Sequence, residues 1–207
     1  TPEYSYCRHL PPSVRAIQDW AADETDYQSA YFGKWHIGPA NDLFNSSFEH
    51  TQRPGTQIGP DPPFLFDTQW HPSSDYWRMV RSVEPRQTGT VDVPIDGFPD
   101  GIAARYAAEF LTKRDPERPF LLYCAFPGPH APWLIPEEFG SRYDPSEIPL
   151  WPNRFDNFLN KPIYQRKLAA IEKRPDGPGC QRSDEELRCA LAYNFSYIEL
   201  IDYLVGQ

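Results

Sequence analysis

The 207-residue chain has few of the cysteine and histidine patterns that mark metal or redox sites. None of its four cysteines is spaced C-x-x-C, and Cys124 lies in an apolar run, where a buried structural thiol is typical. The cysteines therefore do not fix a redox compartment. The histidines give only weak support for a zinc site, because no His-x-His, H-E-x-x-H or Cys/His spacing occurs.

Positive charge and long apolar runs are also scarce. The chain has 20 Lys and Arg against 29 Asp and Glu, for a formal net charge of -9. Such a field repels nucleic acid and anionic membranes, although a small local cationic site remains possible. No apolar run reaches the length of a membrane-spanning helix. We therefore expect no nucleic-acid partner and no membrane-spanning segment.

A helix-then-strand pattern is present twice. Residues 12–24 place Val14, Ile17 and Ala21 on one helical face, and an apolar run follows at 30–35. The length and the apolar content are enough for one sizeable domain with its own core.

The second copy of the pattern defines the expected fold class. Residues 101–115 carry Ile102, Tyr106 and Phe110 at helical spacing, and 119–126 is a nearly continuous apolar run. Strands buried on both faces have this composition, and they are typical of parallel sheets covered by helices. The sequence predicts an α/β fold with a mostly parallel sheet and helices on both faces.

Two proline-rich segments, 41–99 and 132–184, interrupt these units. Because proline disfavours regular elements, we expect irregular surface excursions there, of the kind that often carries function. A final helix begins after Ser183, which forms a capping box with Glu186. Its apolar positions are Leu187, Leu191, Phe195, Ile198 and Ile201, and the pattern still continues at Val205.

A lysine and two histidines follow the two apolar runs. Lys34 and His36 are two residues apart, so in an extended strand they project to the same side while Trp35 turns away. His130 follows the second run between two prolines. Ligands bind at the carboxyl ends of parallel strands, so neighbouring strands would bring these side chains together at an oxyanion site, where a histidine can protonate a leaving oxygen.

The alternative interpretation of Lys34 and His36 is a solvated pair without function, which is common for so short a motif. The remaining histidines, His9, His50 and His71, lie in polar or proline-rich segments, and we interpret them as surface residues.

Three segments resemble the sulfatase family, in the order that the family has them. The family's region with the G-K-W-H-x-G motif is similar to SVRAIQDWAADETDYQSAYFGKWHIGP. A later strand and histidine loop of the family are similar to PFLLYCAFPGPHAPW. A family helix with a Y-x-x-x-I-x-x-x-D-x-x-V-G pattern is similar to ALAYNFSYIELIDYLVGQ. The resemblance implies an alkaline-phosphatase-like fold and hydrolysis of sulfate esters, with a small molecule or a saccharide as the substrate.

Residue roles follow from this resemblance by position. Lys34 would bind the sulfate group, His36 would contact the nucleophile and His130 would face the leaving oxygen. Family members also use a formylglycine, made from Cys or Ser in a C-x-P-x-R type motif, and a Ca²⁺ or Mg²⁺ ion. None of the residues of this chain is expected to ligate that metal.

The sequence departs from the family pattern at its ends. No C-x-P-x-R or S-x-P-x-R motif occurs, since Cys7 is followed by RHLP. The family's N-terminal Asp pair, its later Asp-Asn metal pair and a further lysine are also absent. We therefore expect residues 1–207 to be the central part of one sulfatase catalytic domain, incomplete at both ends and inactive alone.

Three matters stay open from the sequence. A phosphodiesterase or phosphonate hydrolase of the same superfamily would use a similar Lys and His site, and a non-catalytic relative would bind a sulfated ligand without turnover. The particular ester is not defined, because specificity would depend on the irregular loops. Cellular location is undefined too, because a targeting signal would precede Thr1.

Overall fold

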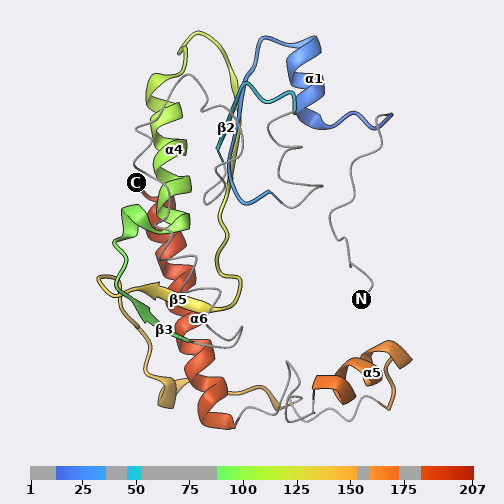
Figure 1. Ribbon diagram of the computed structural model, residues 1–207, viewed down its shortest axis with the longest axis vertical. Helices are drawn as coiled ribbons and strands as arrows, with labels where there is room; N and C mark the ends of the chain where they lie inside the picture. Colours follow the sequence, from blue (N-terminus) through green and yellow to red (C-terminus); the bar gives the residue numbers. More distant parts are fainter. Residues whose placement is uncertain (1–12, 36–45, 53–87, 153–158, 173–182) are drawn as a thin grey trace.

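The computed structural model describes residues 13–35, 46–52, 88–152, 159–172 and 183–207 (Figure 1). Within these ranges the elements are helices and short strands, arranged in two small sheets. Both sheets are parallel. The predicted α/β class is therefore present, with its strands in the predicted relative direction.

The larger sheet has three strands in the order β2-β1-β4. β1 (Gln28–Gly33) pairs in parallel with β2 (His50–Gln52) on one side and β4 (Phe120–Ala125) on the other. β4 confirms the strand expected at 119–126. β1 begins before the run expected at 30–35 and ends at Gly33, so Lys34 follows the strand.

Helix α4 (Pro99–Lys113) covers one face of this sheet. Its helical face is the predicted one, because Ile102, Tyr106 and Phe110 are all buried. They pack on Ala30 and Phe32 of β1, with the Phe32 ring stacked on Tyr106 at a centroid distance of 5.9 Å. Burial of such side chains from water is the main stabilising term of this core.

The other face is covered less than the sequence predicts. Figure 1 shows α1 (Ile17–Glu24) on the side of the sheet opposite α4. An aromatic group of Tyr31, Phe48 and Tyr123 lies here, with ring centroids 5.5 to 6.0 Å apart. Tyr123 is 41% exposed. The expectation that β4 is buried on both faces is therefore wrong, because Phe120 and Tyr123 are exposed and its other residues are only partly buried.

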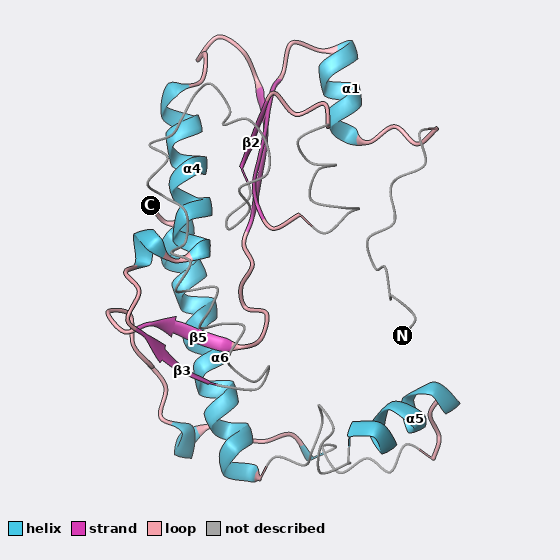
Figure 2. Ribbon diagram, viewed as in Figure 1, coloured by secondary structure: helices cyan, strands magenta, loops and turns pink. Residues whose placement is uncertain are grey.

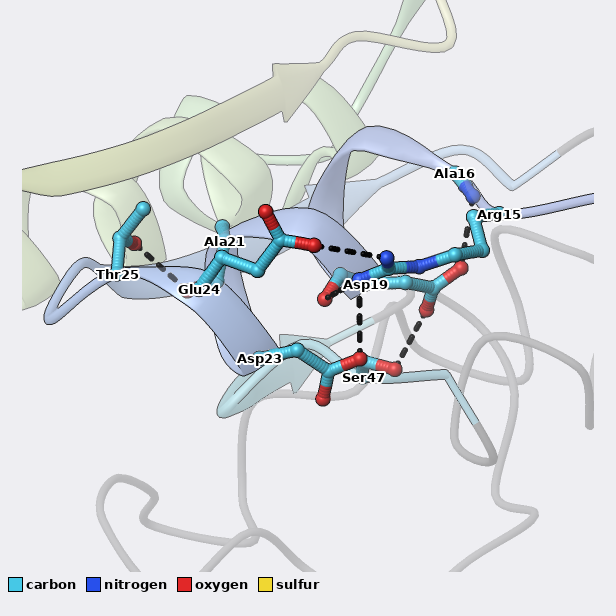
Figure 3. Close-up of polar contacts among 8 residues, drawn as sticks. All are labelled: Arg15, Ala16, Asp19, Ala21, Asp23, Glu24, Thr25 and Ser47. Carbon is cyan, nitrogen blue, oxygen red and sulfur yellow. Dashed lines mark hydrogen bonds and ion pairs between the residues drawn. The ribbon is translucent and has the colours of Figure 1, made fainter.

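Helix α1 starts later than the predicted helix and turns a different face inward. The backbone N–H of Ala16 donates to Asp19 Oδ2 at 2.7 Å, and Asp19 Oδ1 accepts from the Ser47 hydroxyl at 2.5 Å (Figure 3). These bonds fix the first turn. Val14 lies before the helix, and Val14 and Ile17 are about half exposed, 50% and 56%. Of the predicted apolar face, only Ala21 is buried.

The second sheet pairs β3 (Thr88–Val91) with β5 (Trp133–Pro136) and packs against α6 (Asp184–Val205) (Figure 2). The buried residues of this second core are Val91, Phe98, Leu134, Ile135, Tyr197, Leu200 and Leu204. Phe98 immediately precedes α4, so the two cores are joined through the start of that helix.

The proline-rich segments contain more regular structure than we expect from the sequence. Segment 41–99 contributes β2, β3 and the 3-10 helix η1 (Ile95–Gly97), and segment 132–184 contributes β5, η2 (Pro145–Glu147) and α5 (Ile163–Glu172). Two of the described prolines begin helices: Pro99 is the first residue of α4 and Pro145 the first of η2. Proline is tolerated there because no helical N–H bond is lost.

Helix α6 begins where the sequence predicts, but the side chains that it buries are not the predicted ones. Ser183 Oγ accepts from the Glu186 N–H at 3.1 Å, and Glu186 Oε2 accepts from the Ser183 N–H at 2.7 Å. Phe195 and Ile198 are exposed, whereas Tyr197 is buried. No helix among the described residues is long and apolar enough to cross a membrane.

Candidate functional site

Lys34 is placed by the end of β1. Gly33 has a φ of 109°, which side chains with a Cβ disfavour, and a Cβ there would lie 2.1 Å from the carbonyl oxygen of Ala125. The Lys34 N–H donates to that same oxygen at 2.7 Å, and the Tyr31 hydroxyl donates to the Lys34 carbonyl at 2.6 Å. The backbone of the lysine is therefore fixed on both sides.

The break at Gly33 changes the predicted geometry of the motif. Lys34 does not lie in the strand, so strand alternation does not determine where its side chain projects. Trp35 is buried, with 6% exposure, as the sequence predicts. His36 lies outside the described residues, and its relation to Lys34 stays a prediction.

His130 lies in the turn that follows β4. The backbone is cis at Gly128-Pro129 and Ala131-Pro132. The ring is exposed, and its Nδ1 lies 2.6 Å from the carbonyl oxygen of Ala131. Because a carbonyl oxygen only accepts, Nδ1 carries the proton. The other ring nitrogen, Nε2, is then the atom that can exchange a proton with a bound molecule.

The two motifs leave the sheet at the same edge. β1 and β4 are parallel neighbours, and Gly33 is paired with Ala125. Lys34 follows the last residue of β1, and a single residue, Phe126, separates β4 from the turn that begins at Pro127 and contains His130. In parallel sheets this carboxyl edge is where ligands bind. The sequence left open whether the two apolar runs form neighbouring strands, and the pairing of β1 with β4 meets that condition for Lys34 and the His130 turn.

Asp100 is a residue that the sequence reasoning missed. It lies in the first turn of α4 and is 0% exposed. Its Oδ1 accepts from the Gly128 N–H at 2.9 Å, and its Oδ2 accepts from the Tyr197 hydroxyl at 2.8 Å. Burial raises the pKa of Asp100 to about 6, against the lowering effect of these hydrogen bonds. In the sequence it resembles an ordinary acidic residue at a helix start.

A different group of charges lies at the opposite end of the sheet. A cavity of about 370 Å³ is lined by Gln28 at the start of β1, by His50, and by Lys113 and Arg118. Lys113 pairs with Glu109, and Arg118 contacts Glu49 at 3.0 Å. Lys113 and Arg118 thus each have a carboxylate partner, whereas Arg114, which also lines the cavity, donates to the carbonyl oxygens of Asp115 and Arg118.

His50 corrects the interpretation of that residue as a surface histidine. It lies in β2 and is partly buried, with its ring centroid 5.5 Å from that of Phe110. Desolvation lowers its pKa, and the Arg118 charge acts in the same direction, while Glu49 opposes them. The sequence pattern could not predict β2, because a strand of three residues is too short to show an alternation of apolar and polar residues.

Within the described ranges, no three His, Cys, Asp or Glu side chains are grouped so that they could hold a metal ion. The Ca²⁺ or Mg²⁺ and the formylglycine implied by the family resemblance stay predictions.

The geometry defines an α/β protein with parallel strands whose adjacent carboxyl ends carry a lysine and a histidine. The chain is distantly similar to YidJ, an uncharacterized sulfatase of Escherichia coli (strain K12), with 26% identity over 167 residues. The alignment covers 74% of this chain and 31% of the relative, so the chain spans about a third of that protein. No family model matches the sequence.

Proposed function

We propose that the full-length protein is a sulfatase-type hydrolase that cleaves sulfuric ester bonds. The observation that carries the proposal is the exit of Lys34 and of the His130 turn from neighbouring strand ends, Gly33 and Ala125. The distant similarity to a sulfatase agrees with it. A formylglycine outside residues 1–207 would be the nucleophile, and Ca²⁺ or Mg²⁺ would supply electrostatic stabilisation of the developing charge.

The residues of this chain have separate roles in the proposed reaction. Lys34 attracts the anionic oxygens of the ester, and His36 contacts the nucleophile. The nucleophile's oxygen forms a bond to sulfur while the bond from sulfur to the leaving oxygen breaks. That oxygen keeps the electron pair and takes a proton from Nε2 of the protonated His130 ring, which is left as the neutral ring with its remaining proton on Nδ1, bonded to the Ala131 carbonyl.

The proposal is tested with the full-length protein, expressed together with a formylglycine-generating enzyme. We expect release of 4-nitrophenol from 4-nitrophenyl sulfate, and a mass of the nucleophile peptide that shows the aldehyde. Faster cleavage of 4-nitrophenyl phosphate or a phosphonate monoester would instead identify the phosphodiesterase or phosphonate hydrolase alternative. Binding of a sulfated saccharide without any turnover would identify a non-catalytic relative.

A further inference from the structure

The turn with His130 is hydrogen-bonded to one buried carboxylate, that of Asp100. Asp100 Oδ1 accepts from the Gly128 N–H at 2.9 Å, two residues before the histidine. Its Oδ2 accepts from the hydroxyl of Tyr197 at 2.8 Å. Asp100 therefore joins three elements: the start of α4, the turn after β4, and α6. Both of its oxygens are used for this purpose.

The same turn is fixed at a second point. The Pro129 carbonyl accepts from Trp133 Nε1 at 2.9 Å and, at a longer 3.5 Å, from Asn194 Nδ2. A Cβ on Gly128 would lie 2.3 Å from Cε2 of Tyr197, so only glycine lets the turn approach that ring. The two residues before His130 thus have little freedom of position.

An ordinary helix-start role does not account for this arrangement. Carboxylates in a first helical turn stabilise the helix dipole, usually from an exposed position. Asp100 is completely buried, and it is directed at the turn and at another helix. Burying a carboxylate is costly unless its hydrogen bonds compensate for lost solvation. A hydrophobic residue at this position would remove the acceptor of the Gly128 N–H and of the Tyr197 hydroxyl.

We propose that Asp100 and Tyr197 are positioning residues that hold the Gly128 turn and thereby fix the His130 ring at the carboxyl edge of the sheet. The proposal rests on the proposed function, in which His130 protonates the leaving oxygen. Asp100 does not touch the substrate in this scheme. It acts through the backbone of the turn, and a small displacement of a catalytic group costs rate.

The charge state of Asp100 matters for this role. As a carboxylate it accepts both hydrogen bonds, and bonds to an ionised acceptor are stronger than neutral ones. The titratable side chains that face it are Tyr197 from α6 and Cys124 from β4, and the charge of Asp100 adds to burial in raising the pKa of Cys124 to about 11. The Cys124 thiol is therefore neutral at pH 7 and does not oppose the carboxylate with a like charge.

The experiment compares Asp100→Asn, Asp100→Ala and Tyr197→Phe in the full-length protein. Asp202→Asn and Tyr203→Phe, both exposed on α6, are the matched controls. Hydrogen exchange reports the protection of the Gly128 amide. Steady-state kinetics are measured with 4-nitrophenyl sulfate, which has an activated leaving group, and with an alkyl sulfate, whose leaving group needs a proton.

We expect faster exchange at Gly128 in the Asp100→Ala and Tyr197→Phe variants, and unchanged exchange in the controls. Because a positioned acid contributes about 10²- to 10⁴-fold, we expect kcat on the alkyl sulfate to fall roughly tenfold or more beyond any loss on 4-nitrophenyl sulfate. KM should stay within about twofold on both esters. Equal losses on both esters, or unchanged exchange at Gly128, would overturn the proposal.

The positioning role can still be tested if a variant does not fold or if the wild-type protein has no sulfatase activity. If Asp100→Ala does not fold, Asp100→Asn and Tyr197→Phe decide, since both keep the shape of the side chain. If the wild-type protein cleaves no sulfate ester, the proposed function fails. The NMR signal of the His130 ring then decides the positioning role: a changed signal in Asp100→Asn and Tyr197→Phe supports it, and an unchanged signal rejects it.

Discussion

At the scale of single residues, Gly33 and Lys34 show how a residue without a side chain places the next one. The φ of 109° at Gly33 ends β1, and the Lys34 N–H then bonds to Ala125 of the neighbouring strand. The lysine backbone is therefore tied to the strand that leads to His130. This close approach excludes any Cβ at position 33.

Replacing Lys34 by Ala in the full-length protein is expected to lower kcat/KM for 4-nitrophenyl sulfate by about 10²- to 10³-fold, the typical loss for one donor to a developing oxyanion. Sulfate affinity should fall because the charge attracts the ester oxygens in the ground state, and kcat should fall because this attraction is stronger for the charge that develops in the transition state. Lys113→Ala, at the opposite end of the sheet, is the control. A loss confined to KM would contradict a transition-state role.

Replacing His130 by Gln is expected to slow cleavage of an alkyl sulfate more than that of 4-nitrophenyl sulfate. A departing alkoxide needs a proton, whereas an activated phenolate leaves without one. The comparison is the ratio of the two kcat values in the variant and in the wild type. His50→Gln, outside this edge of the sheet, should leave the ratio unchanged. An equal loss on both esters would remove His130 from the acid role.

Asp100 is expected to make stability depend on pH between about 4 and 6. Its pKa is about 6 in the folded protein and about 3.9 in an unfolded chain. Between these values the folded state binds more protons, so the free energy of unfolding falls as pH rises, by about 3 kcal/mol in total.

The measurement for this pH effect is chemical denaturation of the wild type and of Asp100→Asn from pH 4 to pH 7. The variant lacks the titrating group, so the wild type should lose stability relative to it as pH rises. A constant difference between the two proteins over this range would show that the carboxylate does not titrate with a raised pKa.

At the scale of elements, α6 contributes both to the second core and to the proposed site. It carries Tyr197, which bonds to Asp100, and Asn194, which contacts the Pro129 carbonyl. Its first turn is closed by Ser183 and Glu186. The helix therefore supports the His130 turn from a position nearly seventy residues later in the chain.

Ser183→Ala is expected to reduce the free energy of unfolding by about 1 kcal/mol, the usual cost of removing a helix N-cap. Ser183→Thr should restore most of this loss, because its hydroxyl can accept the Glu186 N–H in the same way. The two variants are compared by chemical denaturation of the full-length protein. Equal stability of the alanine variant and the wild type would show that α6 does not depend on this cap.

At the scale of the whole molecule, the described residues leave apolar surface uncovered. Exposed large side chains occur on β4, α1 and α6, and they include Phe120, Tyr123, Trp20, Phe195 and Ile198. Native monomers seldom expose contiguous patches of this kind without a partner or a covering element. Edge strands such as β4 are likewise normally paired or protected.

We therefore expect the 207-residue chain, expressed by itself, to bind a hydrophobic dye more strongly than a native domain of its size and to unfold without a sharp transition. A longer version with flanking sequence is the comparison, and it should unfold cooperatively. A sharp and reversible thermal transition from a soluble monomer of the 207 residues would contradict this expectation.

The sequence alone determined the features that depend on neighbouring residues. The spacing of Ile102, Tyr106 and Phe110 predicted the buried face of α4, and Ser183 with Glu186 predicted the start of α6, because helical period and capping are local. The apolar runs also indicated parallel strands, whereas the pairing of β1 with β4, which brings Lys34 and the His130 turn to adjacent strand ends, was decided by the tertiary structure.

Only the tertiary structure decided which surfaces meet. Asp100 bonds to Gly128, 28 residues away, and to Tyr197, 97 residues away, and no local pattern encodes such contacts. The buried face of α6 likewise depends on where β5 lies, since apolar residues occur on more than one side of the helix. A buried polar group is stable only where distant partners satisfy its hydrogen bonds, and chain folding is what brings those partners to Asp100.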